Sequence, residues 1–232
     1  MLDDIKNKVT HITIGYPDTK IENKNSATVT LIKTPNEYLG ITCFHVLEDL
    51  IKKRNAFAQV GRSLCYRPFQ PGNQDKLLDI IIFSIKEDEI NEIGNHVEFF
   101  NIFCPPVDEQ KCFVIGFPKE ARKDTIELDK IKSNFGYYML PGKITGVGQD
   151  NIYIEINKKT LCGKNTKGDV PAEKIHNLGG ISGGPVVNEA GGLIGIFTNQ
   201  IETIESLEPC QQTKDILSAQ ATRVDIFLSK TG

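Results

Sequence analysis

The amino-acid sequence predicts an all-β protein. Short runs of β-branched and aromatic residues recur along the whole chain. Turn signals such as TPNE, RPFQPGNQ, VGQDN and NEAGG stand between these runs. Their regular spacing is typical of a barrel or a sandwich and disfavours alternating βαβ units. The predicted strands are His11–Ile14, Ala27–Ile32, Leu39–Cys43, Leu77–Ile85, Val97–Phe103, Lys111–Phe117, Lys143–Val147, Asn151–Ile156, Gly184–Val187 and Gly192–Thr198.

Two segments have a helical period instead. Val46–Arg54 predicts a short helix directly after a strand. In Thr213–Lys230, apolar residues roughly follow one face of a 3.6-residue repeat. We therefore expect a carboxy-terminal helix that packs on the β-structure.

A diproline connector divides the chain. Pro105 and Pro106, followed by acidic residues, stand between two predicted strands, as a stiff link between two compact halves would. The expected units are an amino-terminal half 1–104, a connector 105–110, a carboxy-terminal half 111–212 and the helix 213–232. The polar stretch Asn157–Asn177 is interpreted as a solvated loop rather than an anion site, because its lysines neither repeat nor alternate with aromatic residues.

Charge and hydropathy argue against two classes of partner. Lys plus Arg total 27 against 30 Asp plus Glu, which gives a net charge of −3. A charge this small provides no electrostatic basis for binding nucleic acid or an anionic membrane. The longest apolar run, Leu77–Ile85, is also far shorter than the ~20 residues that span a bilayer. We therefore expect neither nucleic acid nor membrane as a partner.

The six cysteines stand singly, without a close pair or a Cys/His cluster at zinc spacing. Reduced, mostly structural thiols are expected, and no metal or other cofactor is implied. The amino terminus begins with acidic residues and lacks the apolar segment of a signal peptide. Together these observations favour the cytoplasm.

The most informative stretch is the glycine-rich LGGISGGPVV, residues 178–187. Glycines on both sides of Ser182 permit backbone with positive φ and the close approach of another molecule. The amides of Gly180 and Ser182 could then point at one spot, as an oxyanion hole requires. The alternative is a glycine-rich β-turn with an incidental serine.

A serine nucleophile needs a base, and His45 is the best placed of the four histidines. It follows the apolar strand 40–44 and opens a helical turn, so its ring projects from a rigid strand end into any cleft there. The alternative is a histidine that makes only structural hydrogen bonds.

Asp79 lies inside the apolar run LLDIIIF. A carboxylate in such a run is expected to be partly buried, and an unpaired buried charge costs several kcal/mol. Asp79 therefore needs a donor, and an imidazole N–H supplies one that also fixes the tautomer of the histidine. The alternative is an edge-strand aspartate turned to water, since Asp75 and Lys76 precede it.

The chain order His45, Asp79, Ser182 and the motifs around these residues resemble a known family. TCFHV resembles the T-A-x-H motif, LDI the D-[IV]-A strand, and GISGGP the G-x-S-G-G-P motif of chymotrypsin-fold (trypsin-like) serine peptidases. The resemblance implies two six-stranded antiparallel β-barrels with a carboxy-terminal helix. By the same resemblance, His45 and Asp79 come from the first barrel, Ser182 comes from the second, and the strand Gly192–Thr198 pairs with the substrate.

Two departures from the secreted trypsins are informative. Val46 stands where those enzymes have a cysteine after the catalytic histidine, so their disulfide is absent. Ile181 stands where they have an aspartate that pairs with a newly cut amino terminus. Both changes resemble bacterial and viral members of the family that do not use zymogen activation.

The resemblance also indicates residues that would bind the substrate. His176 lies six residues before Ser182, where a trypsin has the aspartate at the base of its S1 pocket, and Asn177 follows. Thr198 and Gln200 lie on the strand that lines this pocket. An imidazole offers no fixed negative charge, so we expect no preference for Arg or Lys before the scissile bond. A polar or acidic residue and an apolar one both stay open.

The leading functional hypothesis is a serine endopeptidase that works through a Ser-His-Asp triad and an acyl-enzyme. Its partners would be a protein or peptide substrate and, where activity is regulated, a regulatory protein. The alternative is a catalytically silent module of the same fold that binds a partner peptide by strand addition at Gly192–Thr198.

Overall fold

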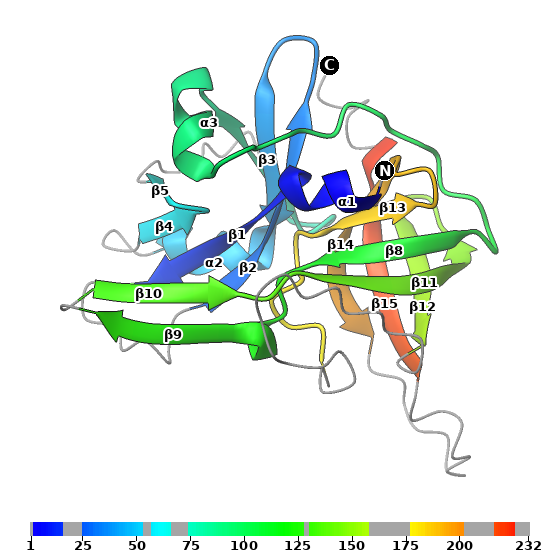
Figure 1. Ribbon diagram of the computed structural model, residues 1–232. Coiled ribbons are helices and arrows are strands. Elements are labelled where there is room, and N and C mark those ends of the chain that lie inside the picture. The colour runs from blue at the N-terminus through cyan, green and yellow to red at the C-terminus, as the bar shows by residue number, and fades with distance from the viewer. Residues whose placement is uncertain are drawn as a thin grey trace.

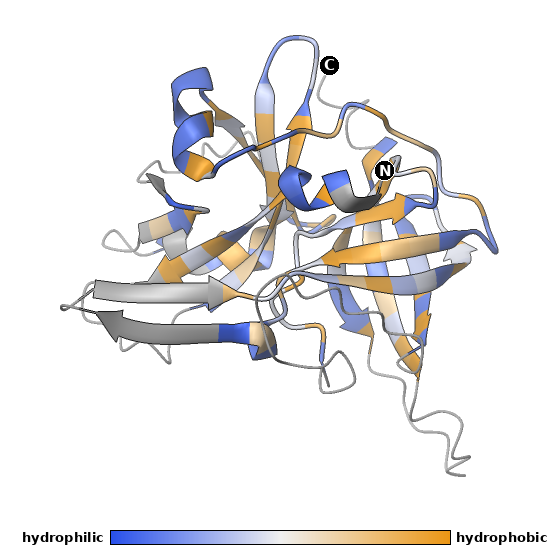
Figure 2. Ribbon diagram, in the orientation of Figure 1, coloured by the Kyte–Doolittle hydropathy of each residue, from blue (hydrophilic) through white to orange (hydrophobic). Residues whose placement is uncertain are grey.

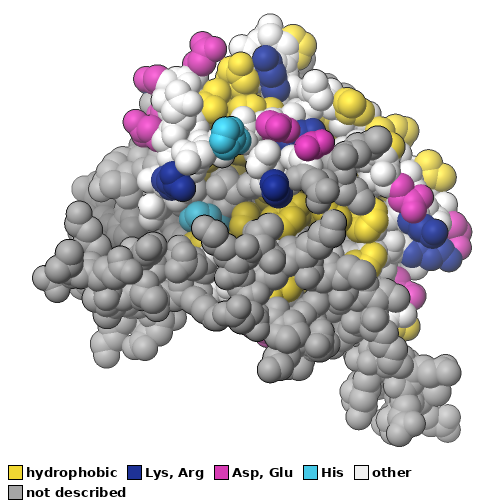
Figure 3. All heavy atoms as spheres, in the orientation of Figure 1, with side chains coloured by type: hydrophobic (Ala, Val, Ile, Leu, Met, Phe, Trp, Pro, Cys, Tyr) yellow, Lys and Arg dark blue, Asp and Glu magenta, His cyan; other side chains and the backbone are white. Residues whose placement is uncertain are grey.

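The computed structural model describes residues 2–15, 25–52, 57–65, 74–127, 130–157, 177–201 and 216–225. Strands dominate, as the sequence predicts, and they form two halves that pack side by side (Figure 1). No helix in the described ranges is long and apolar enough to cross a membrane. Acidic and basic side chains both occur on the described part of the face in Figure 3.

The amino-terminal half is a seven-stranded sheet in the order β5-β4-β1-β2-β3-β7-β6. Its strands are β1 (Val9–Gly15), β2 (Asn25–Lys33), β3 (Tyr38–Cys43), β4 (Phe57–Val60), β5 (Ser63–Cys65), β6 (Gln74–Asp75) and β7 (Ile80–Ile85). Helices α1 (Leu2–Ile5), α2 (Phe44–Lys52) and α3 (Glu87–Ile93) accompany it. The helix predicted at Val46–Arg54 is therefore present as α2, with different ends.

This sheet does not close within the described residues, so the predicted first six-stranded barrel is not confirmed there. Its edge strands β5 and β6 have three and two residues. Closure needs tilted strands with enough paired length to join the two edges. Residues 66–73, which connect these strands, lie outside the described ranges.

The carboxy-terminal half is a closed barrel in the order β11-β12-β15-β14-β13-β8. Its strands are β8 (Lys111–Gly116), β11 (Tyr138–Val147), β12 (Asn151–Asn157), β13 (Pro185–Asn188), β14 (Leu193–Ile201) and β15 (Ile216–Arg223). In β12, Ile152, Ile154 and Ile156 are buried while the residues between them face outward. This period of two fills the barrel interior, as Figure 2 shows by the alternation of hydrophobic and hydrophilic residues.

The predicted carboxy-terminal helix is wrong over 216–223, which form β15. This strand pairs with both β12 and β14 and thereby closes the barrel. Leu217, Ala219 and Ala221 point inward at every second position. A pattern of small apolar residues fits both a helix and a strand. The segment forms a strand because it pairs with the edges of β12 and β14. Residues 226–232 lie outside the described ranges.

Two further segments differ from the prediction. Val97–Phe103 forms no strand; it makes isolated bridges from Phe100 to Ile32 and from Phe103 to Leu193. A hairpin of β9 (Arg122–Glu127) and β10 (Lys130–Phe135) was not predicted, and Figure 1 shows it reaching from the barrel beneath the amino-terminal sheet. Phe135 at its end stacks on His11 of β1, with ring centroids 4.0 Å apart.

A hydrophobic cluster joins the two halves. Ile32 and Ile41 from the sheet pack with Ile115, Leu193 and Ile196 from the barrel, and all five are buried. Each half also has a core of its own. The halves therefore form one body, and the residues at their junction are held from both sides.

Candidate active site

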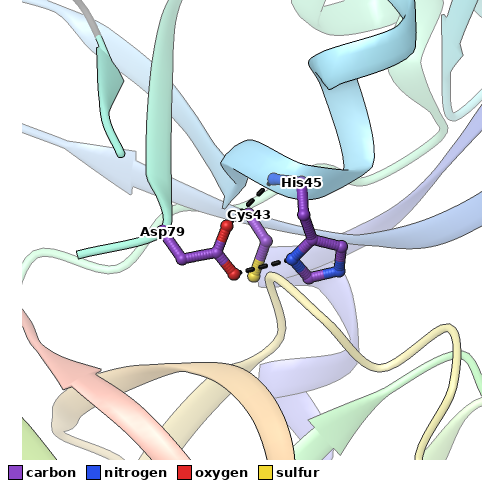
Figure 4. Close-up of side chains that lie close together, drawn as sticks. All are labelled: Cys43, His45 and Asp79. Carbon is purple, nitrogen blue, oxygen red and sulfur yellow. Dashed lines mark hydrogen bonds and ion pairs between the residues drawn. The ribbon is translucent and has the colours of Figure 1, made fainter. Parts of the chain in front are cut away.

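His45 lies where the buried strand β3 turns into helix α2. The Phe44 amide donates to the Asp79 carbonyl oxygen at 3.0 Å, and the His45 amide donates to Asp79 Oδ1 at 2.9 Å. The His45 ring is bonded to the same carboxylate, with Nδ1 2.6 Å from Oδ2 (Figure 4). About half of the His45 side chain is exposed (51%), against 30% for Asp79. One nitrogen of the ring is thus held while the side chain stays accessible.

Asp79 is set by a turn rather than by a strand. The predicted strand Leu77–Ile85 begins only at Ile80, because the Asp75 side chain accepts hydrogen bonds from the amides of Leu77 and Leu78. Asp79 itself adopts φ +54°, a left-handed conformation that aspartate tolerates better than most residues. This conformation directs its carboxylate to His45, in contrast to the alternative of an aspartate turned to water.

Cys43 lies beneath this pair. Its thiol donates to the Phe197 carbonyl oxygen at 3.3 Å, and its sulfur lies within 4.8 Å of ligand atoms of His45 and Asp79. Such a group could in principle hold a metal ion. Burial, and next the charge of Asp79, raise the pKa of the Cys43 thiol well above its ordinary value. A protonated thiol that donates to a carbonyl suits packing better than metal binding.

Ser182 lies in a tight turn between β12 and β13. The Ile181 amide donates to the Leu178 carbonyl at 3.0 Å, and the Gly184 amide donates to that of Ile181 at 2.7 Å. Ile181 is buried in the barrel core, where the charged residue of the secreted trypsins could not be placed without a partner. Apolar packing therefore anchors the turn from below.

Two glycines of this turn are required by its geometry. Gly180 has φ +90° and Gly183 has φ +86°. A Cβ at Gly183 would lie 2.2 Å from the Thr28 carbonyl oxygen, and one at Gly180 would lie 2.6 Å from the Lys119 nitrogen. Both positions combine a backbone conformation that favours glycine with a neighbour too close for any side chain.

The Gly180 and Ser182 amides differ from the others in the turn. Those of Ile181, Gly183 and Gly184 donate to backbone carbonyls, whereas Gly180 and Ser182 donate to no acceptor within the described ranges. The Gly179 carbonyl accepts a hydrogen bond from the Lys119 amide at 2.7 Å. In a trans peptide the Gly180 N–H points the opposite way, so it faces away from Lys119.

Thr198 links Ser182 to the strand that ends at His45. Both Ser182 Oγ and Cys43 Sγ contact the Thr198 carbonyl oxygen, at 3.5 and 4.0 Å. Cys43 is two residues before His45, and its sulfur lies within 4.8 Å of ligand atoms of His45 and Asp79. In this structure the Ser182 hydroxyl donates to Thr198 and not to His45.

The predicted substrate-binding residues have different positions. Thr198 is buried and its hydroxyl donates to the Gln220 carbonyl at 3.2 Å. Gln200 is half-buried and its side-chain oxygen accepts a hydrogen bond from the Leu178 amide at 2.9 Å. Asn177 is exposed and accepts one from the Gly179 amide, and His176 lies outside the described residues.

A model of the trypsin-like peptidase domain matches residues 30–196, well over half of the chain. The chain belongs to the trypsin-like peptidase domain family. The family predicted from the motifs around His45, Asp79 and Ser182 is thus confirmed, and all three residues of this peptidase domain lie within the match. A comparison with the curated proteins finds no match.

Solved structures share the fold of the peptidase domain at low sequence identity. A serine endoprotease from Yersinia pestis is 17% identical with a TM-score of 0.57, and it covers 98% of this chain and 64% of its own. A variant of the HtrA-type protease AlgW with a tripeptide is 15% identical with a TM-score of 0.55, and the match covers 98% of this chain and 61% of that protein. The active form of the Rv3671c protease from M. tuberculosis is 13% identical with a TM-score of 0.51, and the match covers 98% of this chain and 81% of that protein. The chain thus spans less than two thirds of the first two proteins.

Proposed function

We propose that this chain is a serine endopeptidase in which Ser182 is the nucleophile, His45 the general base and then acid, and Asp79 the group that orients His45. The observation that carries the proposal is the 2.6 Å contact between His45 Nδ1 and Asp79 Oδ2, next to a turn whose Gly180 and Ser182 amides have no described acceptor. A side-chain acid–base pair and two converging amides are the parts that acyl transfer needs.

The reaction begins when His45 Nε2 takes the proton of the Ser182 hydroxyl and Oγ bonds to the substrate carbonyl carbon. The carbon–nitrogen bond then breaks, and its electron pair leaves with the amine, which takes the proton from His45. Water attacks the resulting ester, gives a proton to His45, and the product acid leaves as Ser182 regains its hydrogen. Since catalytic hydrogen bonds often form only with substrate, the resting contact of Ser182 with Thr198 fits this role.

The Gly180 and Ser182 amides form the proposed oxyanion hole. Negative charge develops on the substrate oxygen as Ser182 attacks, and two fixed N–H donors stabilise it. Removing one such donor costs about 3 kcal/mol of transition-state stabilisation in comparable enzymes. No cofactor takes part in these steps.

The end of β14 offers an edge for a peptide substrate. The predicted pairing strand Gly192–Thr198 is largely occupied, because Gly195 and Ile196 pair with β13 on one side and β15 on the other. Asn199–Ile201, in contrast, pair only with β15 within the described chain. An extended peptide can therefore add to this free edge by backbone hydrogen bonds, which supports a protein or peptide substrate.

Gln200 links two segments that would flank the substrate. By the family resemblance, the residue whose carbonyl is attacked, called P1, would place its side chain between β14 and the segment that leads to Ser182. The bond from the Leu178 amide to Gln200 links these two walls. A small P1 residue therefore fits better than a long one, in keeping with the expectation that Arg and Lys are not preferred.

We keep the cytoplasm as the proposed compartment. Cys43, Cys104 and Cys112 are free, and the other three cysteines lie outside the side chains that the structure describes. Alkylation without reductant, followed by mass spectrometry, should modify all six once the protein is unfolded. A bridged pair would indicate an oxidising compartment.

Peptide hydrolysis tests the proposed function. The chain should cleave members of an internally quenched peptide library, and Ser182→Ala should abolish cleavage at an unchanged melting temperature. Thr145→Ala, which changes an exposed hydroxyl of β11, is the matched control and should keep full activity. Cleavage that survives in Ser182→Ala would refute the proposal.

A further inference from the structure

Strand β2 presents two buried threonine hydroxyls to the turn that carries Ser182. Thr28 and Thr30 alternate along β2 and are fully buried, although the surrounding positions are apolar. Thr28 Oγ1 donates to the Gly180 carbonyl oxygen at 2.9 Å, and Thr30 Oγ1 donates to that of Gly183 at 2.7 Å. These contacts join residues more than 150 positions apart, one in each half.

The direction of the Thr28 hydroxyl is fixed by a second contact. The Phe117 amide donates to Thr28 Oγ1 at 3.1 Å, so this oxygen acts as an acceptor toward Phe117. The single hydroxyl hydrogen is then left for the Gly180 carbonyl. The side chain therefore makes a directed bridge from β8 to the turn.

The backbone of Thr28 is held as firmly as its side chain. Its amide donates to the Ser182 carbonyl at 2.9 Å, and its own carbonyl accepts from the Thr42 hydroxyl at 2.8 Å. A residue with its amide, carbonyl and hydroxyl all engaged in a buried junction has little freedom to move. Thr28 can thus hold the turn in one position.

Gly180 has no side chain that could anchor it, so its orientation depends on hydrogen bonds to the neighbouring peptide groups. The peptide before Gly180 is held at the Gly179 carbonyl by the Lys119 amide. The peptide after it is held at the Ile181 amide by the Leu178 carbonyl and at the Gly180 carbonyl by the Thr28 hydroxyl, which is the bond from the other half. A rotation of the 179–180 peptide would turn the Gly180 N–H away from the oxyanion position. It would also twist the next peptide, which Thr28 opposes.

We propose that Thr28 is a positioning residue that keeps the oxyanion hole ordered before substrate arrives. This inference rests on the proposed peptidase function and extends it to regulation. The hydroxyl takes the place of the ion pair that Ile181 cannot make, so the site needs no newly cut amino terminus. Thr28 does not touch the reacting atoms; it acts through Gly180.

The test compares Thr28→Val with Thr28→Ser. Valine keeps the shape of threonine but offers no hydrogen to Gly180 and no acceptor to Phe117. We expect kcat to fall about 10- to 100-fold with KM changed less than about twofold, since the loss concerns transition-state stabilisation. Thr28→Ser keeps the hydroxyl and should retain kcat within about threefold. A tag added before Met1 should likewise change kcat/KM less than about threefold.

Thr30→Val is the matched control. It removes one buried hydrogen bond from the same strand, to Gly183, which lies beyond the nucleophile. Thr28→Val should lower the melting temperature more than Thr30→Val, because it also leaves the Phe117 amide without its acceptor. A strong fall in kcat is expected only for Thr28→Val. Thr28→Ala, which leaves room for a water, is measured beside them in case the valine variant does not fold.

The outcomes separate this inference from the proposed function. Folded Thr28→Val and Thr28→Ala variants with full kcat, or equal losses in Thr28→Val and Thr30→Val, would overturn the role of Thr28 and leave the peptidase function standing. A wild-type chain that cleaves no peptide would instead overturn the peptidase function itself.

Discussion

In the proposed active site, the two halves of the molecule contribute different kinds of chemical group. The open amino-terminal sheet supplies side chains, His45 and Asp79, which are held by a turn and a strand end. The closed carboxy-terminal barrel supplies the Ser182 hydroxyl and two backbone amides in a glycine-rich turn. Proton transfer requires particular side chains, whereas the oxyanion hole requires a particular backbone.

This difference predicts how each half responds to mutation. Replacing a side chain in the amino-terminal half should remove chemistry and leave the fold. The conformation of the carboxy-terminal turn depends on its glycines, so adding a side chain there should lower stability more than deleting one.

The largest effect is expected for the nucleophile and the base. Ser182→Ala and His45→Ala should each lower kcat by about 10⁶, and the double variant should be no worse, because the residues act as one unit. Melting temperatures should change little. Additive losses in steady-state kinetics would mean that the two halves do not work together.

Asp79→Asn should follow, with a loss of about 10⁴ in kcat, since an amide favours the wrong tautomer of His45. Asparagine also tolerates the left-handed backbone at this position, so the fold should survive. Most of the activity retained at neutral pH would remove Asp79 from the mechanism.

Gly183→Ala tests the backbone side of the contrast. The added Cβ would meet the Thr28 carbonyl at 2.2 Å and the Thr42 hydroxyl at 2.4 Å, at a φ of +86°. We expect a loss of about 4 kcal/mol in unfolding free energy and of activity as well. Gly94→Ala, whose Cβ would have its closest contact at 3.6 Å, is the control and should be nearly neutral in denaturant unfolding.

His11 gives a pH test of the contact between the halves. The pKa of His11 is lowered from 6.5 to about 4, chiefly by burial and also by the Arg122 charge, although a hydrogen bond with the Gly61 backbone raises it. The folded state therefore resists protonation, so its stability is complete above pH 6.5 and falls as the pH drops toward 4. The loss amounts to about 3 kcal/mol.

Denaturant unfolding at pH 7 and pH 4 measures this loss. His11→Phe keeps a ring against Phe135 and should lose this part of the acid sensitivity. His96→Asn changes an exposed histidine and should keep it. An unchanged pH slope in His11→Phe would show that other groups cause the acid sensitivity.

The smallest effect is expected at Gln200. Gln200→Ala removes the link to Leu178 and should raise kcat/KM about tenfold for peptides with a longer P1 residue, an effect of about 1.4 kcal/mol. Peptides with Gly or Ala at P1 should change less. Equal changes for all peptides would show that Gln200 does not limit the pocket.

The sequence predicted the parts of the site that local motifs encode. An apolar strand ending in His45, a carboxylate within an apolar run and glycines around Ser182 each have a physical signature within ten residues. The role of Thr28 could not be predicted in this way, because its partner Gly180 is brought to it only by packing of the two halves. Alternating buried threonines in Ala27–Ile32 were the one available signal.

In the fold, too, local sequence patterns were predicted and long-range pairing was not. Strands with strong apolar character were predicted, whereas β15 was assigned as a helix because its short apolar residues Leu217, Ala219 and Ala221 fit either period. Only the open edges of β12 and β14 determine that it is a strand. Closure of the first barrel was likewise inferred from resemblance, and the short strands β5 and β6 do not provide it.

Covalent labelling by a fluorophosphonate tests the central claim most directly, because the reagent needs the nucleophile, the base and the oxyanion hole at once. Mass spectrometry of the labelled chain should find one adduct, on Ser182, and Ser182→Ala and His45→Ala should both abolish it. A folded protein that takes no label would contradict the account and favour a silent module that binds peptides by strand addition. An adduct on another residue would contradict it as well.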